Sequence, residues 1–131
     1  MNNLIRARTR ISLDMTENKA ITALLREYFS TKLSNGFNTI DMFAQDMQIS
    51  SKKLQRLLNE ENTTFSAELN AFRRQKAKEF LAKTKTPLWL IANNLGYSSR
   101  EAFNTACKRW FGCSPTRLRS RAGTRLGDFS H

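Results

Sequence analysis

The chain has 131 residues and carries 22 Lys and Arg against 11 Asp and Glu, which leaves a formal net charge of +11. With 40% hydrophobic and 10% aromatic residues, it is not composed like a disordered protein. No apolar stretch reaches the roughly 20 residues of a membrane span, and no secretory signal is visible, so we expect a cytoplasmic protein without a membrane partner. The excess positive charge indicates a polyanionic partner.

The sequence offers no recognisable set of residues for catalysis or cofactor binding. Cys107 and Cys113 have no histidine near them, since His131 is the only histidine, and a metal site needs more thiolates or imidazoles. We therefore expect two buried, reduced thiols, no metal and no cofactor. A glycine-rich phosphate loop and a nucleophile paired with histidine are also lacking, so an enzyme is not expected.

The apolar residues recur at spacings of three and four, which is typical of helices. Valine is absent, and two Pro and five Gly leave few turn residues for a β-rich fold. We expect an all-α fold of seven helices. The expected segments are a basic arm or linker remnant at 1–16, a first helix-turn-helix subdomain at 17–63, a linker helix at 64–84, a second helix-turn-helix subdomain at 85–121 and a flexible tail at 122–131.

The first half of the chain predicts three helices. The first begins near Thr16 and ends at Gly36, which can take the left-handed cap conformation. The second begins after Thr39, whose hydroxyl can cap it, and the third begins at Ser50 or Ser51. Two short helices joined by so brief a turn form a helix-turn-helix unit.

The second half predicts a long helix and a second unit of the same kind. The long helix covers 65–83, about 29 Å at 1.5 Å per residue. Thr86 is the expected cap of the next helix, with Pro87 at its first position, and Ser98 with Glu101 stands at capping-box spacing before the one after. A rod of about 29 Å would hold the two units near the ~34 Å that separates major grooves on one face of DNA.

The third and sixth helices carry polar side chains that suit base edges in a major groove. Arg can bind guanine through two bonds, Gln or Asn can bind adenine likewise, and Glu can accept from cytosine. The alternative for each of them is a solvated helix face. From the residues alone the candidate base contacts are Lys52, Gln55, Arg56, Arg100, Glu101, Asn104 and Thr105.

Other basic and hydroxyl residues suit contacts with phosphate, the alternative being ordinary solvated charge. Arg73 or Arg74 could instead hold a helix end or a carboxylate. The candidate phosphate contacts are Ser50, Arg73, Ser98, Ser99, Lys108, Arg109, Arg117 and Arg119. An RNA-binding or nucleoid-associated basic helical protein remains the alternative function, although it gives no reason for two matched helix-turn-helix units.

The second unit resembles the DNA-binding domain of the AraC/XylS family of bacterial transcription regulators. The matching residues are Ile91-Ala92, Leu95-Gly96-Tyr97, Phe103, Lys108, Trp110-Phe111-Gly112, Ser114-Pro115 and Arg119, with Ala44, Ser50, Leu54, Arg56 and Leu58 in the first unit. The resemblance covers about residues 17 to 121. It implies two homeodomain-like units bridged by a long helix, and a monomeric domain that binds two adjacent major grooves of a double-stranded DNA operator.

The resemblance also implies transcription activation through contact with RNA polymerase, and it adds Ser51 to the candidate base contacts. Most family members carry a further effector-binding or dimerisation domain, so we expect either a small stand-alone regulator or the C-terminal piece of a longer one. The operator, the regulated genes and any effector are not predicted.

Four positions depart from the family pattern. Gln48 replaces the usual Gly of the first turn, so we expect a less sharply turned backbone there, and Asn62 replaces the Gly after the third helix. Cys107 replaces a core aromatic, and Trp110 is expected to fill the missing volume. Thr105 stands where relatives often carry Arg, which shifts the expected base reading to Arg100 and Asn104.

Overall fold

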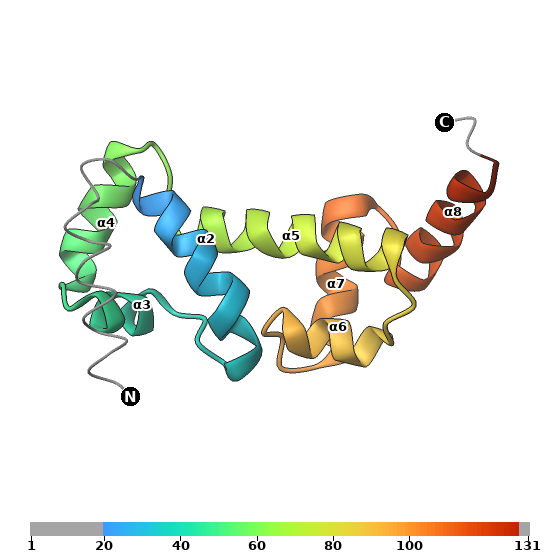
Figure 1. Cartoon of the computed structure of the whole chain (residues 1–131), viewed down its shortest axis with the longest axis horizontal. Coiled ribbons are helices and arrows are strands. Elements are labelled where there is room, and N and C mark those ends of the chain that lie inside the picture. The colour runs from blue at the N-terminus through green and yellow to red at the C-terminus, as the bar shows by residue number, and fades with distance from the viewer. Residues whose placement is uncertain (1–19, 129–131) are drawn as a thin grey trace. The chain divides into compact units, whose positions relative to one another are not determined.

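The computed structural model describes residues 20–128, with side chains as far as Arg121, and shows seven α-helices in this part of the chain (Figure 1). The elements are α2 (Ile21–Lys32), the 3₁₀ turn η2 (Leu33–Asn35), α3 (Ile40–Met47), α4 (Ser51–Glu60), α5 (Phe65–Lys83), α6 (Leu88–Asn94), α7 (Arg100–Phe111) and α8 (Pro115–Asp128). No residue between 20 and 128 is in a strand, and the all-α prediction is confirmed. The predicted helix start near Thr16 and the predicted basic arm lie outside the described residues.

The chain divides into two compact units, and the boundary between Phe72 and Arg73 lies inside α5. The first core is formed by α2, α3, α4 and the start of α5, and its fully buried residues include Leu25, Phe29, Phe43, Leu54 and Leu58. The second core is formed by the end of α5 with α6 and α7, and includes Ala77, Leu81, Ile91, Leu95 and Phe103. The long helix expected to link the units therefore contributes apolar side chains to both cores.

Both cysteines are free and buried, as predicted. Cys107 is fully buried in the second core, and Trp110, partly buried, packs against the same core. Burial raises the pKa of the Cys107 thiol to about 12. Cys107 is thus accommodated in this core as a neutral thiol.

The two helix-turn-helix turns are built by the same backbone hydrogen bond. The N–H of Ile49 donates to the carbonyl of Ala44 at 3.0 Å, and the N–H of Tyr97 donates to that of Ala92 at 2.9 Å. Each bond runs back five residues and closes a Schellman motif at the end of the first helix of its unit. Ala44 and Ala92 are each 2% exposed, so the similarity of the two units extends to local geometry.

Gln48 takes the conformation that glycine takes in the second turn. Its φ is 61°, against 81° for Gly96, so the expectation of a less sharply turned backbone at Gln48 is wrong. The hydrogen bonds of the Schellman motif require a left-handed residue there, whatever its side chain, at a cost of about 1–2 kcal/mol for a residue with a Cβ. Asn62, with φ 63°, fills the same role after α4.

Helix α7, the second helix of the second helix-turn-helix, begins one residue later than the sequence pattern predicts. The cap of α7 is Ser99, whose Oγ accepts from the Ala102 N–H at 3.1 Å, and α7 starts at Arg100. The prediction of Ser98 is wrong because the turn from Ala92 to Ser99 has one residue more than the turn from Ala44 to Ser50.

The start of α6 also differs from the prediction. Pro87 lies outside the helix, with an extended ψ of 146°, and Thr86 makes no side-chain cap. Instead the N–H of Thr86 donates to Thr84 Oγ1 at 3.2 Å, which holds Thr86 in the turn after α5. The helix therefore starts at Leu88 rather than at Pro87.

The last helix is longer than the sequence pattern indicates. Ser114 caps it by accepting from the Arg117 N–H at 3.2 Å, and Pro115 occupies its first position. The helix continues to Asp128, so residues 122–128, expected to lie in a tail, are helical. Once a helix is nucleated, each added residue contributes a backbone hydrogen bond, which favours such extension.

Candidate nucleic-acid interface

Helix α4 is amphipathic and presents a polar row to solvent. The Oγ of Ser50 accepts from the Lys53 N–H at 3.0 Å and caps the helix, while Leu54 and Leu58 anchor it in the first core. The exposed residues on the other side are Lys52, Gln55, Arg56 and Asn59. The predicted common face of these four residues is confirmed as an exposed face.

Ser51 differs from the other base-contact candidates on α4, because its hydroxyl is already used. It donates a hydrogen bond to the carboxylate of Asp41 on α3 and is half-buried, so it joins α4 to α3. Lys53, by contrast, is exposed in the first turn of α4. Lys53 lies off the predicted face, and its place near the helix N-terminus is the sequence signal that indicates a phosphate contact.

Arg56 is paired within its own helix. Its Nη1 lies 3.1 Å from Glu60 Oε2, and both side chains are about 60% exposed. An exposed pair of this kind contributes at most about 1 kcal/mol. The guanidinium can therefore leave Glu60 for a stronger acceptor at little cost.

Helix α7 presents a smaller polar face than predicted. Arg100, Glu101 and Thr105 are exposed, but Asn104 is half-buried, and its Oδ1 is inaccessible to solvent and has no hydrogen-bond partner in the described part of the chain. To meet a base edge, the Asn104 amide would have to rotate outward. The expected base reading of α7 therefore moves further toward Arg100.

Arg73 holds the turn that precedes α7. Its Nε donates to the carbonyl of Leu95 at 2.7 Å and its Nη2 to that of Gly96 at 3.0 Å, while its guanidinium carbon lies 4.2 Å from the centre of the Tyr97 ring. Burial lowers the pKa of Arg73 and raises that of Tyr97. These bonds confirm the alternative expected for Arg73, a cation that satisfies a helix end.

The remaining residues that were predicted to contact phosphate differ in their exposure to solvent. Arg119 is half-buried, and its Nη2 donates to the carbonyl of Phe80 at 3.3 Å, so it ties α8 to α5 within the second unit. Lys108, Arg109 and Arg117 are exposed. The hydroxyls of Ser50 and Ser99 serve as helix caps, and Ser98 is exposed without that role.

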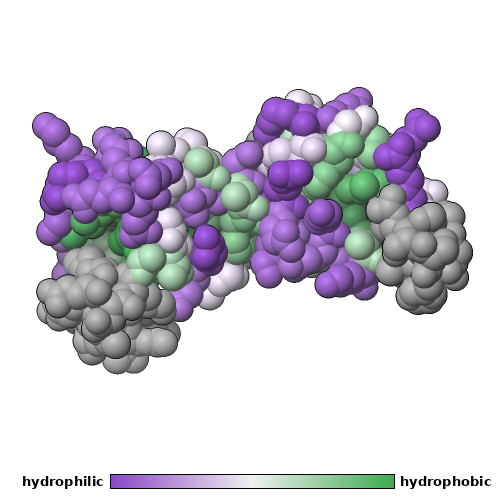
Figure 2. Space-filling view, turned by 90° about the horizontal axis from the view of Figure 1, so that it is seen from above, coloured by the Kyte–Doolittle hydropathy of each residue, from purple (hydrophilic) through white to green (hydrophobic). Residues whose placement is uncertain are grey.

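On the face drawn in Figure 2, hydrophilic residues cover most of each unit, with smaller apolar areas between them. Within residues 20–128 no group of His, Cys, Asp and Glu could hold a metal ion, and none of the helices there is both long and apolar enough to cross a membrane. Exposed cations lie on both α4 and α7, and α4 also carries two exposed carboxamides, Gln55 and Asn59.

Residues 43–121, from within α3 into α8, match the family described as a helix-turn-helix domain. The chain belongs to the AraC-type helix-turn-helix family of DNA-binding transcription regulators. It is 31% identical over 110 residues to the HTH-type transcriptional regulator VirS of Mycobacterium tuberculosis, an alignment that covers 84% of this chain. It is 30% identical over 83 residues to the ornithine utilization regulator of Pseudomonas aeruginosa, and that alignment covers 63% of this chain.

Solved structures of the family have the same fold. The C-terminal domain of AraT, a response regulator from Geobacillus stearothermophilus, superposes with a TM-score of 0.68 at 30% identity, covering 77% of this chain and 84% of that one. A DNA-binding transcriptional dual regulator from Escherichia coli K-12 gives a TM-score of 0.62 at 25% identity, covering 77% and 94%. The alignments cover 31% of VirS and 24% of the ornithine utilization regulator, so this AraC-type chain spans less than a third of those relatives.

Proposed function

We propose that this AraC-type chain binds a specific double-stranded DNA operator by placing α4 and α7 in adjacent major grooves. The observation that carries the proposal is the pair of matched turns, each followed by a helix whose exposed residues are hydrogen-bonding side chains. Arg and Gln can discriminate base pairs in the major groove, which presents a different donor and acceptor pattern for each pair. The proposed base contacts are Lys52, Gln55 and Arg56 on α4 and Arg100, Glu101 and Thr105 on α7.

We further propose that Ser50, Ser99, Lys108, Arg109 and Arg117 contact the DNA backbone. The first two stand at helix N-termini, where free N–H groups and the helix dipole favour phosphate. The other three are exposed cations, whose contacts fix the register of a protein on DNA without reading sequence. Lys53 joins this set because it is exposed at the start of α4.

We propose transcription activation as the outcome of operator binding, with the domain acting as a monomer that contacts RNA polymerase. A 31% identical relative over 84 residues is the RCS-specific HTH-type transcriptional activator RclR of Escherichia coli, which supports activation over repression. Transcription in vitro from a template with the operator upstream of a weak promoter tests this step. Increased transcript with added protein is expected, and decreased transcript would contradict activation.

Selection from a pool of random duplex DNA tests the binding proposal. We expect a recovered site with two half-sites about one helical turn apart, because each unit contributes one recognition helix. A site with only one conserved block would contradict the use of both helices. Competition with structured RNA belongs in the same experiment, since a preference for RNA would contradict the choice of duplex DNA as the partner.

A further inference from the structure

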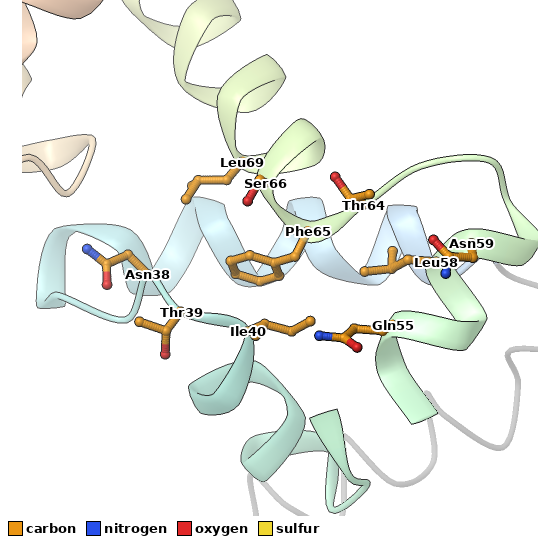
Figure 3. A pocket seen from close by; sticks show the side chains of 10 residues that line it. All are labelled: Asn38, Thr39, Ile40, Gln55, Leu58, Asn59, Thr64, Phe65, Ser66 and Leu69. Carbon is orange, nitrogen blue, oxygen red and sulfur yellow. The ribbon is translucent and has the colours of Figure 1, made fainter. Parts of the chain in front are cut away.

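A pocket of about 480 Å³ lies in the first unit, among the start of α3, α4 and the start of α5 (Figure 3). This volume falls within the range of about 300–1,000 Å³ that is usual for small-molecule sites. Its apolar walls are Ile40, Leu58, Phe65 and Leu69. Of the candidate DNA contacts only Gln55 lines it, so the proposed DNA binding leaves most of the pocket unused.

The pocket contains no charged lining residue, although a quarter of the chain is charged. Its polar lining consists of three carboxamides and three hydroxyls, from Asn38, Gln55, Asn59, Thr39, Thr64 and Ser66. A phosphate or a carboxylate would find no cation there, and a metal ion would find no carboxylate. The lining therefore favours an uncharged ligand.

Two helices begin at the pocket, α3 at Ile40 and α5 at Phe65, and each N-terminus carries the equivalent of about half a positive charge. Each first turn also holds a carboxylate, Asp41 in α3 and Glu68 in α5. A full negative charge outweighs half a positive one at similar distance. Glu68 is also paired with Arg26, whose Nη2 lies 3.9 Å from Glu68 Oε1, so the first turn of α3 disfavours an anion more than that of α5 does.

Hydrogen-bond donors remain available on the threonines. Thr39 Oγ1 accepts from the Met42 N–H at 3.2 Å, and Thr64 Oγ1 accepts from the Ala67 N–H at 3.1 Å. A hydroxyl that accepts in this way still has its own proton to donate. Each cap can therefore also bind a carbonyl or hydroxyl oxygen of a ligand.

We propose that this pocket binds an uncharged small molecule with a flat apolar body and a carbonyl, amide or hydroxyl group at its edge. Figure 3 shows the Phe65 ring in the middle of the lining, with Ile40 beside it and the carboxamides and hydroxyls around them. The apolar body packs against these two side chains, and its polar edge meets the surrounding donors. Small-molecule sites generally combine an apolar lining with a few placed polar groups in this way.

Occupation of the pocket is expected to affect operator binding, because Gln55 both lines the pocket and belongs to the exposed face of α4. A ligand that engages the Gln55 amide changes its availability to a base, and such coupling acts equally in both directions. This coupling rests on the proposed function, whereas the binding of the small molecule does not.

Titration of the ¹⁵N-labelled chain with benzamide, followed by NMR, tests the binding without DNA. We expect the chemical shifts of Thr39, Gln55 and Phe65 to change and to saturate at a benzamide concentration of about 10 mM, since a fragment of this size binds weakly. Benzoate and benzylamine have nearly the same shape but carry a charge. The dissociation constant of each, measured from the shifts of these residues, is expected to be at least about tenfold higher than that of benzamide. Absence of saturable shifts for benzamide, or equal binding of the charged analogues at these residues, would overturn the proposal.

Two variants locate the site. Ser66→Trp places a bulky side chain in the mouth of the pocket and is expected to weaken benzamide binding by about tenfold or more, whereas Ala71→Trp, an exposed residue of the same helix outside the lining, should not. Asn38→Trp obstructs another wall of the pocket, and it gives an independent test if Ser66→Trp does not fold. Retained affinity in both pocket variants would contradict the site. If benzamide binds but leaves operator affinity unchanged, the pocket stands and the coupling through Gln55 is wrong.

Discussion

The guanidinium carbon of Arg73 lies 4.2 Å from the centre of the Tyr97 ring, and both side chains are partly buried in the second unit. The same guanidinium donates to two carbonyls at the end of α6. A planar cation with several donors suits such a site, because it can stack on a ring while it satisfies two acceptors. Arg73 therefore positions the turn that leads into α7.

Arg73→Lys separates these two roles, because it keeps the positive charge and removes the planar donors. We expect the variant to lower the free energy of unfolding by about 2 kcal/mol, since an ammonium cannot bind both carbonyls and stack on Tyr97. Urea denaturation followed by circular dichroism measures this. Arg74→Lys, at an exposed neighbouring position, is the matched control and should change stability by less than about 0.5 kcal/mol. Unchanged stability of Arg73→Lys would return Arg73 to the phosphate candidates.

Gln48→Gly is expected to stabilise the chain by roughly 0.5–1 kcal/mol. A left-handed conformation costs a residue with a Cβ about 1–2 kcal/mol, and glycine avoids this cost. Part of the resulting stabilisation is lost, because glycine gives the unfolded chain more conformational freedom. Gln45→Gly makes the same replacement in the middle of α3 and should destabilise by about 1 kcal/mol. Thermal unfolding of both variants checks the signs, and destabilisation by both would contradict the left-handed turn at Gln48.

The helices and most of their buried faces could be predicted from apolar spacing, because that pattern is local. Caps and turns were less predictable, since Ser98 and Ser99 are adjacent serines and only the extra residue in the second turn decides between them. The roles of Arg73 and Arg119 depend on carbonyl groups far away in the sequence, at Leu95 and Phe80. No local pattern reveals such partners.

The same limit applies to the candidate DNA-binding faces. Exposure of Lys52, Gln55 and Arg56 follows from the helical period, and the structure bears it out. The bond from Ser51 to Asp41 and the burial of the Asn104 amide oxygen depend on how α3 packs against α4 and α7 against its core. Periodicity identifies a face but not which of its polar groups is already engaged.

Ser99→Ala is expected to destabilise the chain by about 1 kcal/mol, because it removes the oxygen that accepts from the Ala102 N–H. Ser98→Ala, the neighbouring exposed serine, should change stability by less than about 0.5 kcal/mol. Chemical denaturation of the two variants side by side makes the comparison. The reverse order would place the start of α7 one residue earlier.

Lys108→Ala is expected to weaken binding to all duplex sequences alike and to reduce the slope of log affinity against log salt by about 1, as loss of one phosphate contact requires. Arg26→Ala removes the same charge from an exposed position outside the proposed contacts and should leave the slope nearly unchanged. Fluorescence anisotropy across a salt series gives both slopes. Equal slopes for Lys108→Ala and the unmodified chain would exclude Lys108 from the phosphate contacts.

The most direct test of the proposed reading by two helices is to repeat the duplex selection with Arg56→Ala on α4 and with Arg100→Ala on α7. We predict that each variant loses about 1–3 kcal/mol of affinity for the original operator and relaxes sequence preference in one half-site only, a different half-site for each. Relaxation of the same base pairs by both variants, or an equal loss of affinity for operator and random DNA, would contradict the account.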